Sequence, residues 1–425
     1  MQILAIATIV ALLVACSSPE SGSTSPRIPA TPVGDQLRWL IGQLNGTSAP
    51  TERDISAHFA PEFLQGFPSE VLAQTLQQTS AQSGGVTLRG FSTPLDRAQA
   101  IALLETEQSV EGTREVAAYI NVEPEEPHRI TYLALSEPPY PSARDLATPG
   151  PYTGAFGAGE GREIFLTCSG SGSPTVILES GAGGGANAWV KVQPDVASFT
   201  RVCSYDRANI PGGASDPAPK PRTGKDVVAD LHGALSAAGV PGPYVLVGHS
   251  DGGLFVRLYA STFPEDVAGM VLVDAVSEFE ATVGPRMLKE LLPPQEWKQY
   301  QAQLQQPAPP FVARVDDEQI DLERTFAETE AAASAHPLPP IPLFVLTRGT
   351  PTPPPPGASP VMAEAQEQLW MHVQGLLADL VPGAKHLVVE DSGHIIQEDE
   401  PQVVIDAIQE VVEGVRSPGS WSSDQ

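Results

Sequence analysis

Two patterns of hydrophobic and polar positions follow each other along this chain. In the first, apolar residues recur at helical spacing, as in Leu37, Leu40 and Leu44, and the period shifts towards two from about residue 86. This part predicts three helices, followed by strands at residues 86–91, 100–106, 115–122 and 129–135. Helices followed by a meander of strands predict a small α+β domain over residues 34–137.

The second pattern alternates short apolar runs with helical segments. The runs are residues 164–168, 175–179, 201–205, 244–248, 269–274, 343–347 and 385–389, with a weaker one at 153–157. Such alternation predicts a largely parallel sheet covered by helices. We expect this α/β domain at residues 152–415, after a Pro-rich interdomain linker at 138–151 and before a disordered tail at 416–425.

The start of the chain predicts a targeting segment rather than part of a fold. Residues 3–14 form an apolar run that is too short to span a bilayer, and it ends in Leu13-Val14-Ala15-Cys16. This ending resembles a bacterial lipoprotein signal at residues 1–16, which implies a lipid on Cys16, although Met1-Gln2 lacks the usual basic residue. An ordinary signal or short anchor is the alternative. Residues 17–33 predict a flexible tether, so we expect an extracytoplasmic, membrane-anchored protein.

Charge and composition exclude several other classes of protein. The chain has 24 Lys and Arg against 51 Asp and Glu, a net charge of −27. This argues against a surface for nucleic acid or anionic lipid, both of which need clustered basic residues. No Cys and His cluster has zinc-site spacing, and we expect neither a metal nor a cofactor. The acid-rich residues 316–330 predict a solvated face, or alternatively an acidic rim that favours cationic substrates.

One motif predicts nucleophilic catalysis. Gly248-His249-Ser250-Asp251-Gly252 is a G-x-S-x-G sequence that lies between a buried-strand run and a helical pattern. The sharp turn needs small neighbours, which the two glycines supply, and it raises the serine hydroxyl above the sheet. We therefore predict Ser250 as the nucleophile, against the alternative of a plain N-cap serine. His249 is expected to pack or orient.

In this setting residues 150–415 resemble the α/β-hydrolase superfamily. The motifs that carry the likeness are residues 175–183, 201–207, 269–274 and 392–394. The resemblance implies an oxyanion hole formed by the backbone N–H groups of Ala182 and Asp251, and a helical cap at about 277–340. Aromatic residues of the cap, such as Trp297 and Tyr300, line an apolar pocket or pack the cap onto the body.

The first domain resembles the cone-shaped α+β fold of SnoaL-like cyclases and steroid isomerases. The likeness rests on its helix–strand pattern and on Leu37-Arg38-Trp39-Leu40 with Leu44-Asn45-Gly46. Its charged residues form no evident catalytic pair. We therefore expect an accessory module.

A serine nucleophile needs a near-neutral base, and the base needs an acid. Among eight histidines, His394 lies in a loop after the last strand, where its side chain can reach the sheet's carboxyl edge. The loop after residues 343–347 contains no acid as far as residue 360, whereas Asp274 ends the preceding strand. We predict Asp274 as the acid, with Glu364 and Asp391 as rivals.

Cys168 and Cys203 remain once Cys16 is assigned to lipid. The family's sheet order places their strands side by side, which implies a disulfide in an oxidising compartment. The alternative is two buried free thiols.

The expected function is hydrolysis of a carboxylic ester of a small acyl substrate, through an acyl-enzyme on Ser250. The alternatives are an amidase or aminopeptidase, a thioesterase or a cofactor-free perhydrolase with the same triad, or a non-catalytic binding lipoprotein. The sequence leaves the oligomeric state open.

Overall fold

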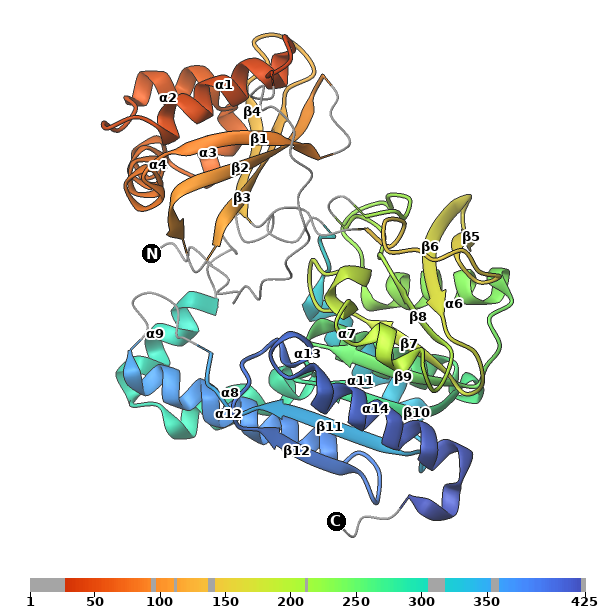
Figure 1. Cartoon of the computed structure of the whole chain (residues 1–425). Helices are drawn as coiled ribbons and strands as arrows, with labels where there is room; N and C mark the ends of the chain where they lie inside the picture. The colour runs from red at the N-terminus through yellow and green to blue at the C-terminus, as the bar shows by residue number, and fades with distance from the viewer. Residues whose placement is uncertain are drawn as a thin grey trace. The chain divides into compact units, whose positions relative to one another are not determined.

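The computed structural model describes residues 27–92, 97–110, 113–136, 142–210, 213–304, 318–352 and 359–421. These residues form two compact units, the first up to residue 136 and the second from residue 142 (Figure 1). The lipoprotein signal and the lipidation site predicted at Cys16 lie outside the described residues. None of the helices described is long and apolar enough to cross a membrane.

The first unit packs helices against a four-stranded antiparallel sheet (Figure 1). Its elements are α1 (Pro32–Leu44), α2 (Glu52–His58), α3 (Pro61–Gly66), α4 (Ser69–Ser83), β1 (Val86–Ser92), β2 (Gln99–Val110), β3 (Thr113–Val122) and β4 (Ile130–Ser136), with strand order β1-β2-β3-β4. Leu37, Leu40 and Leu44 are buried on one face of α1, which is why the helical spacing predicted this element. The short helix α3 was not predicted, because six residues carry too little periodicity.

The second unit is built on an eight-stranded mixed sheet. Its strands are β5 (Gly154–Gly159), β6 (Arg162–Ser169), β7 (Thr175–Glu179), β8 (Val202–Tyr205), β9 (Tyr244–His249), β10 (Val267–Val273), β11 (Leu343–Arg348) and β12 (Lys385–Val389), in the order β12-β11-β10-β9-β7-β8-β6-β5. The strands from β12 to β8 are parallel to one another, and β6 and β5 are antiparallel to their neighbours. The carboxyl ends of the parallel strands therefore meet at one edge.

Helices cover both faces of this sheet (Figure 1). On β10, Val271 and Val273 pack into the cluster that contains α14 (Pro401–Arg416) and α5 (Gln193–Val196), whereas Met270 and Leu272 belong to the opposite cluster. That second cluster contains residues of α6 (Gly224–Ala238), α7 (Asp251–Thr262) and α12 (Pro360–Ala378). Because both faces are buried, the central strands read as continuous apolar runs.

The expected cap lies between β10 and β11. Its described helices are α8 (Phe279–Leu291), α9 (Pro294–Leu304) and α11 (Leu322–Ala335). Trp297 and Tyr300 of α9 pack against an apolar cluster of α8 and α12 that includes Leu288 and Leu369. This contact favours the packing role for these two aromatic residues.

Two expected domain boundaries need correction. Ala143, inside the expected linker at 138–151, is fully buried against Phe165 and Ala186 of the second unit, and its N–H donates to Asp206 Oδ2 at 2.8 Å. At the other end, the expected disordered tail at 416–425 begins with described residues. The indole N–H of Trp421 donates to Gly383 O at 2.9 Å, and its ring packs in the core cluster of α14. Because both segments are rich in Pro and Gly, their sequences did not predict that Ala143 and Trp421 would be packed.

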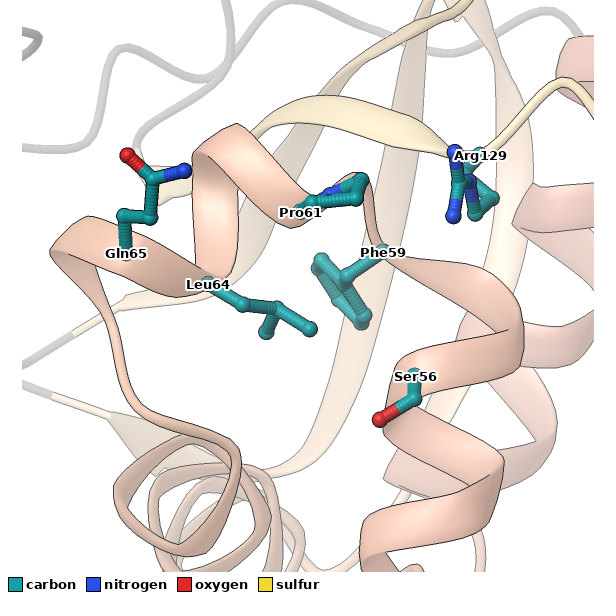
Figure 2. A pocket seen from close by; sticks show the side chains of 6 residues that line it. All are labelled: Ser56, Phe59, Pro61, Leu64, Gln65 and Arg129. Atoms are coloured by element: carbon teal, nitrogen blue, oxygen red, sulfur yellow. The ribbon is translucent and has the colours of Figure 1, made fainter.

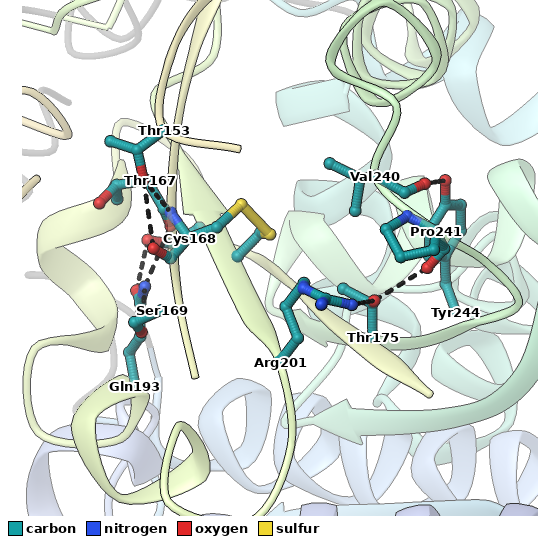
Figure 3. Close-up of a disulfide and its surroundings, with 12 residues drawn as sticks. Thr153, Thr167, Cys168, Ser169, Thr175, Gln193, Arg201, Val240, Pro241 and Tyr244 are labelled. Carbon is teal, nitrogen blue, oxygen red and sulfur yellow. Dashed lines mark hydrogen bonds between the residues drawn. A yellow bond between two sulfur atoms is a disulfide. The ribbon is translucent and has the colours of Figure 1, made fainter. Parts of the chain in front are cut away.

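Cys168 of β6 and Cys203 of β8 are joined by a disulfide (Figure 3). The two residues face each other across the antiparallel β6–β8 pair, with their Cα atoms 4.1 Å apart. The hydroxyl of Thr153 makes two hydrogen bonds to the backbone of Cys168. It accepts from the N–H at 3.0 Å and donates to the carbonyl at 3.2 Å. The bridge therefore fastens the antiparallel edge of the sheet to its parallel body.

Candidate active site

Ser250 sits on a strained turn between β9 and α7. Its φ and ψ are 52° and −123°, a region that side-chain-bearing residues rarely adopt. A Cβ on Gly248 would lie 2.5 Å from the carbonyl O of Gly252, and one on Gly252 would lie 2.5 Å from the carbonyl O of Glu179. The two glycines are therefore sterically required, as the G-x-S-x-G sequence predicted.

Three predicted site residues form one continuous hydrogen-bonded chain. His394 Nε2 lies 3.0 Å from Ser250 Oγ, and His394 Nδ1 lies 2.6 Å from Asp274 Oδ2. Because a carboxylate only accepts, Nδ1 carries the proton and Nε2 is free to accept the serine proton. This arrangement can activate a hydroxyl for nucleophilic attack.

The backbone ties Ser250 to the turn that carries Asp274. Ser250 N–H donates to Val273 O at 3.2 Å, and Val276 N–H donates to Ser250 O at 2.9 Å. Asp274 also has a positive φ of 41° and is fully buried. The surrounding sheet thus holds the backbone of Ser250 and Asp274 in strained conformations, and this fixes the direction of both side chains.

Asp274 is held by donors on both of its oxygens. Oδ1 accepts from the Arg348 backbone N–H at 3.1 Å and from the Trp370 indole N–H at 2.9 Å. The Arg348 guanidinium lies 3.4 Å from Oδ2 and stacks on Trp370. Burial by itself would raise the pKa of Asp274, but the His394 hydrogen bond and the His394 and Arg348 charges outweigh it and lower that pKa. Asp274 is therefore ionised at neutral pH.

The rival acids lie elsewhere. Glu364 is exposed on α12, where its carboxylate accepts from Gln368 at 3.3 Å, and Asp391 is exposed in the turn after β12. Neither makes a described contact with His394. The loop that carries His394 is held instead by Asp399, whose Oδ2 accepts from the Gly393 N–H at 2.9 Å.

His249 contacts the backbone of His394, the predicted base, rather than Ser250. Its Nε2 lies 2.9 Å from the carbonyl O of His394, so Nε2 carries the proton and donates it. Burial, with the neighbouring His394 charge adding, lowers the pKa of His249 to about 3. A neutral His249 therefore supports the His394 loop through this hydrogen bond, as expected for a residue that packs or orients.

The predicted oxyanion-hole loop passes directly beside the serine. A Cβ on Gly181 would lie 2.9 Å from Ser250 Cβ and 3.0 Å from His249 Nδ1. Ala182 follows at once, and Asp251 is the first residue of α7, where helix N–H groups have no intrahelical acceptor. Asp251 thus follows Ser250 directly in the chain, and Ala182 belongs to a loop whose Gly181 lies against Ser250.

Sequence reasoning missed four charged or polar neighbours of this site: Glu280, Arg348, Trp370 and Arg207. Burial raises the pKa of Glu280, in the first turn of α8, to about 7, and the charges of Asp251 and Asp274 add to the effect. These residues come from elements that are far apart in sequence. No local spacing could have linked them to Ser250.

A hollow in the first unit offers no comparable chemistry. It has a volume of about 420 Å³ and is lined by Ser56, Phe59, Pro61, Leu64, Gln65 and Arg129 (Figure 2). Arg129 is paired with Glu123 through two contacts, Nε–Oε2 at 3.2 Å and Nη2–Oε1 at 3.0 Å. None of the residues that line it is a His, Asp or Glu that could take a proton from Ser56. In the described part of the chain, no group of three or more Cys, His, Asp or Glu side chains could hold a metal ion.

Residues 176–407, more than half of the chain, match the family described as "Alpha/beta hydrolase family". The chain therefore belongs to the α/β-hydrolase family, which confirms the predicted fold class. Residues 28–111 match a second family, described as "ORF 12 gene product N-terminal". This match covers most of the first unit without identifying it as SnoaL-like.

Among curated proteins, YqjL of Bacillus subtilis is 26% identical over 242 residues, which cover 57% of this chain and 85% of YqjL. A protein of Hormonema carpetanum described as "Probable transporter efuK" is 32% identical over 128 residues, but the match spans only 18% of its length and 30% of this chain. Among solved structures, a thermophilic esterase from Thermogutta terrifontis is 20% identical with a TM-score of 0.42, covering 60% of this chain and 95% of that one.

Proposed function

We propose that this protein is a serine hydrolase that cleaves carboxylic esters through an acyl-enzyme on Ser250. The observation that carries the proposal is the unbroken chain from Asp274 through His394 to Ser250, with contacts of 2.6 and 3.0 Å, on a strained turn beside a glycine loop. This is the arrangement that acyl transfer by serine requires.

In the proposed reaction, His394 Nε2 takes the Ser250 proton as Oγ attacks the ester carbonyl carbon. The resulting oxyanion is held by the Ala182 and Asp251 N–H groups, and Asp274 stabilises the imidazolium. His394 then gives the proton to the leaving alcohol as the C–O bond breaks. Water deprotonated by His394 attacks the acyl-enzyme in the same way and releases the acid.

Esters are the proposed substrate class because an alkoxide or phenolate leaves more readily than an amide nitrogen. A site with these groups therefore cleaves an ester at a lower barrier than the corresponding amide. An amidase, a thioesterase or a perhydrolase would share the same residues, so the acyl group and leaving group must be tested directly.

The test is pre-steady-state hydrolysis of p-nitrophenyl acetate, butyrate and octanoate, with p-nitroanilides of the same acids as matched controls. We expect a burst of one p-nitrophenol per enzyme, followed by turnover, and much slower release from the anilides. Faster cleavage of the anilides would identify an amidase. No turnover of any ester by folded protein would contradict the proposal.

We also propose that the first unit is dispensable for chemistry, because all the proposed catalytic residues belong to the second unit. A chain that starts at Pro141 is expected to hydrolyse p-nitrophenyl acetate at nearly the full-length rate. A chain that starts at Pro149 loses the buried Ala143 and is expected to melt at a lower temperature. Kinetics and thermal melting of both forms check this. A folded but inactive chain from Pro141 would contradict it.

We further propose that the protein is extracytoplasmic and held at a membrane by a lipid on Cys16, on the strength of the Leu13-Val14-Ala15-Cys16 sequence. Replacing Cys16 by Ala in the full chain, expressed in a bacterium that processes lipoproteins, is expected to abolish incorporation of labelled palmitate. Labelling that persists in Cys16→Ala would rule out this site.

A further inference from the structure

A fully buried ion cluster lies directly beneath the predicted oxyanion-hole loop. Arg207, which follows β8, donates to Glu179 Oε1 at 2.6 Å, to Glu318 Oε1 at 2.7 Å and to Glu318 Oε2 at 2.6 Å. The three side chains are each about 1% exposed. The Tyr205 hydroxyl donates to the second oxygen of Glu179, and burial raises the pKa of Glu179. Charged groups are costly to bury unless they are bonded as closely as these are.

Arg207 also binds that loop directly, through two backbone carbonyls and, at 3.3 Å, through Ser180 Oγ. Its Nη1 donates to the carbonyl of Ser180 at 2.6 Å, and its Nη2 donates to the carbonyl of Gly181 at 2.6 Å. The guanidinium is planar and always charged, so these two carbonyls are fixed relative to each other. Burial opposes the charge of Arg207, but the two glutamates outweigh it and raise the pKa of Arg207.

The carbonyl of Gly181 belongs to the same peptide group as the N–H of Ala182. The C=O and N–H of a planar trans peptide point in opposite directions. Holding the Gly181 carbonyl towards the buried Arg207 therefore turns the Ala182 N–H the other way, out of the core. No described backbone hydrogen bond uses that N–H, which leaves it available to an oxyanion beside Ser250.

Glu318 supplies the second support, and it comes from the cap insertion. Its Oε2 accepts from the N–H of Gly183 at 3.3 Å while it binds Arg207 through both oxygens. The residues after Glu318 also join the cap insertion to the segment before α6, because Gln319 O accepts from the Arg222 N–H and Asp321 N–H donates to Arg222 O. The cap insertion thus reaches below the loop.

We propose that Arg207 and Glu318 are positioning residues for the oxyanion hole, and that the cap contributes to transition-state stabilisation through Glu318. The proposal rests on the proposed function, because it assigns the Ala182 N–H to an oxyanion. Arg207 sets the direction of the Gly181–Ala182 peptide. Glu318 holds Arg207 and the next peptide in place.

The experiment compares Glu318→Gln and Arg207→Lys with a matched control, Asp230→Asn. Asp230 is also a buried carboxylate paired with arginines, accepting from Arg222 Nη2 at 2.5 Å and from Arg162 at 2.8 and 2.9 Å, but it makes no described contact with residues 180–184. All rates are divided by the number of sites that a fluorophosphonate labels, so that loss of folded protein is not read as loss of chemistry.

For Glu318→Gln and Arg207→Lys we expect kcat per labelled site to fall about 10- to 100-fold, with little change in KM. This fall is smaller than the one caused by removing a whole oxyanion donor. Affinity for a boronic acid, whose tetrahedral adduct places an oxygen in the hole, should fall by a similar factor. Asp230→Asn should melt at a lower temperature and keep kcat per labelled site.

Normal kcat and boronate affinity per labelled site in Glu318→Gln and Arg207→Lys would overturn the positioning role and leave a structural ion cluster. An equal fall in Asp230→Asn would overturn it as well, because any buried charge would then have the same effect. Wild-type protein that no fluorophosphonate labels would instead contradict the proposed function itself.

Discussion

Replacing Asp274 by Asn is expected to lower kcat by about four orders of magnitude and leave the fold intact. The physical reason lies in the donors around the carboxylate. Oδ1 accepts from the Arg348 N–H and the Trp370 indole N–H, so the carbonyl oxygen of the new amide side chain would take that position. The amide NH₂ group would then face His394 and donate to Nδ1. His394 would be left with its proton on Nε2, where it cannot accept from Ser250.

The measurement is steady-state hydrolysis of an activated ester by Asp274→Asn, with circular dichroism to verify the fold. Glu364→Gln and Asp391→Asn serve as matched controls, since they remove the same charge from the exposed rival acids. Both controls are expected to turn over normally. If Asp274→Asn keeps its kcat while Glu364→Gln or Asp391→Asn loses it, the acid has been wrongly assigned.

The second large effect is expected for Gly252→Ala, which adds one methyl group to the turn beneath Ser250. The new Cβ would lie 2.5 Å from the carbonyl O of Glu179 and 2.7 Å from that of Ser180, closer than real contacts allow. The start of α7 must move away from the end of β7, which separates Ser250 from residues 180–184. A misplacement of about 1 Å at a reacting group costs about 100-fold in rate.

We therefore expect Gly252→Ala to lose about 100-fold or more in kcat per folded molecule and to melt at a lower temperature. Gly375→Ala is the control, because a Cβ at that position in α12 meets nothing within 4 Å. A helical Gly-to-Ala change of this kind adds about 1 kcal/mol of stability. A fully active Gly252→Ala would show that the turn tolerates a side chain at this position.

The sequence predicted the parts of the site that depend on local pattern. The turn that carries Ser250 follows the fully buried apolar run of β9, and the loop of His394 follows the short strand β12 at the edge of the sheet. Both places at the carboxyl ends of strands were therefore readable from the sequence. Asp274 could be predicted because the loop after β11 is poor in acids. The fold class followed from the same alternation of strands and helices.

The supports of the site could not be predicted, because they arise from contacts over long sequence distances. Trp370 reaches Asp274 from the middle of α12, and Glu318 reaches Arg207 across 111 positions of the chain. A buried arginine has no local sequence signature of its own, since its partners decide whether burial is stable. The burial of Ala143 and Trp421 was missed for a related reason, since Pro- and Gly-rich segments can pack as well as link.

The most direct test of the proposed function is covalent labelling of the full-length protein by a fluorophosphonate, followed by peptide mass spectrometry. We expect one modification per folded molecule, on Ser250, and none in Ser250→Ala or after heat denaturation. His394→Ala should be labelled far more slowly, because the base is missing. Labelling that persists unchanged in Ser250→Ala, or folded wild-type protein that is never labelled, would contradict the assignment of this protein as a serine hydrolase.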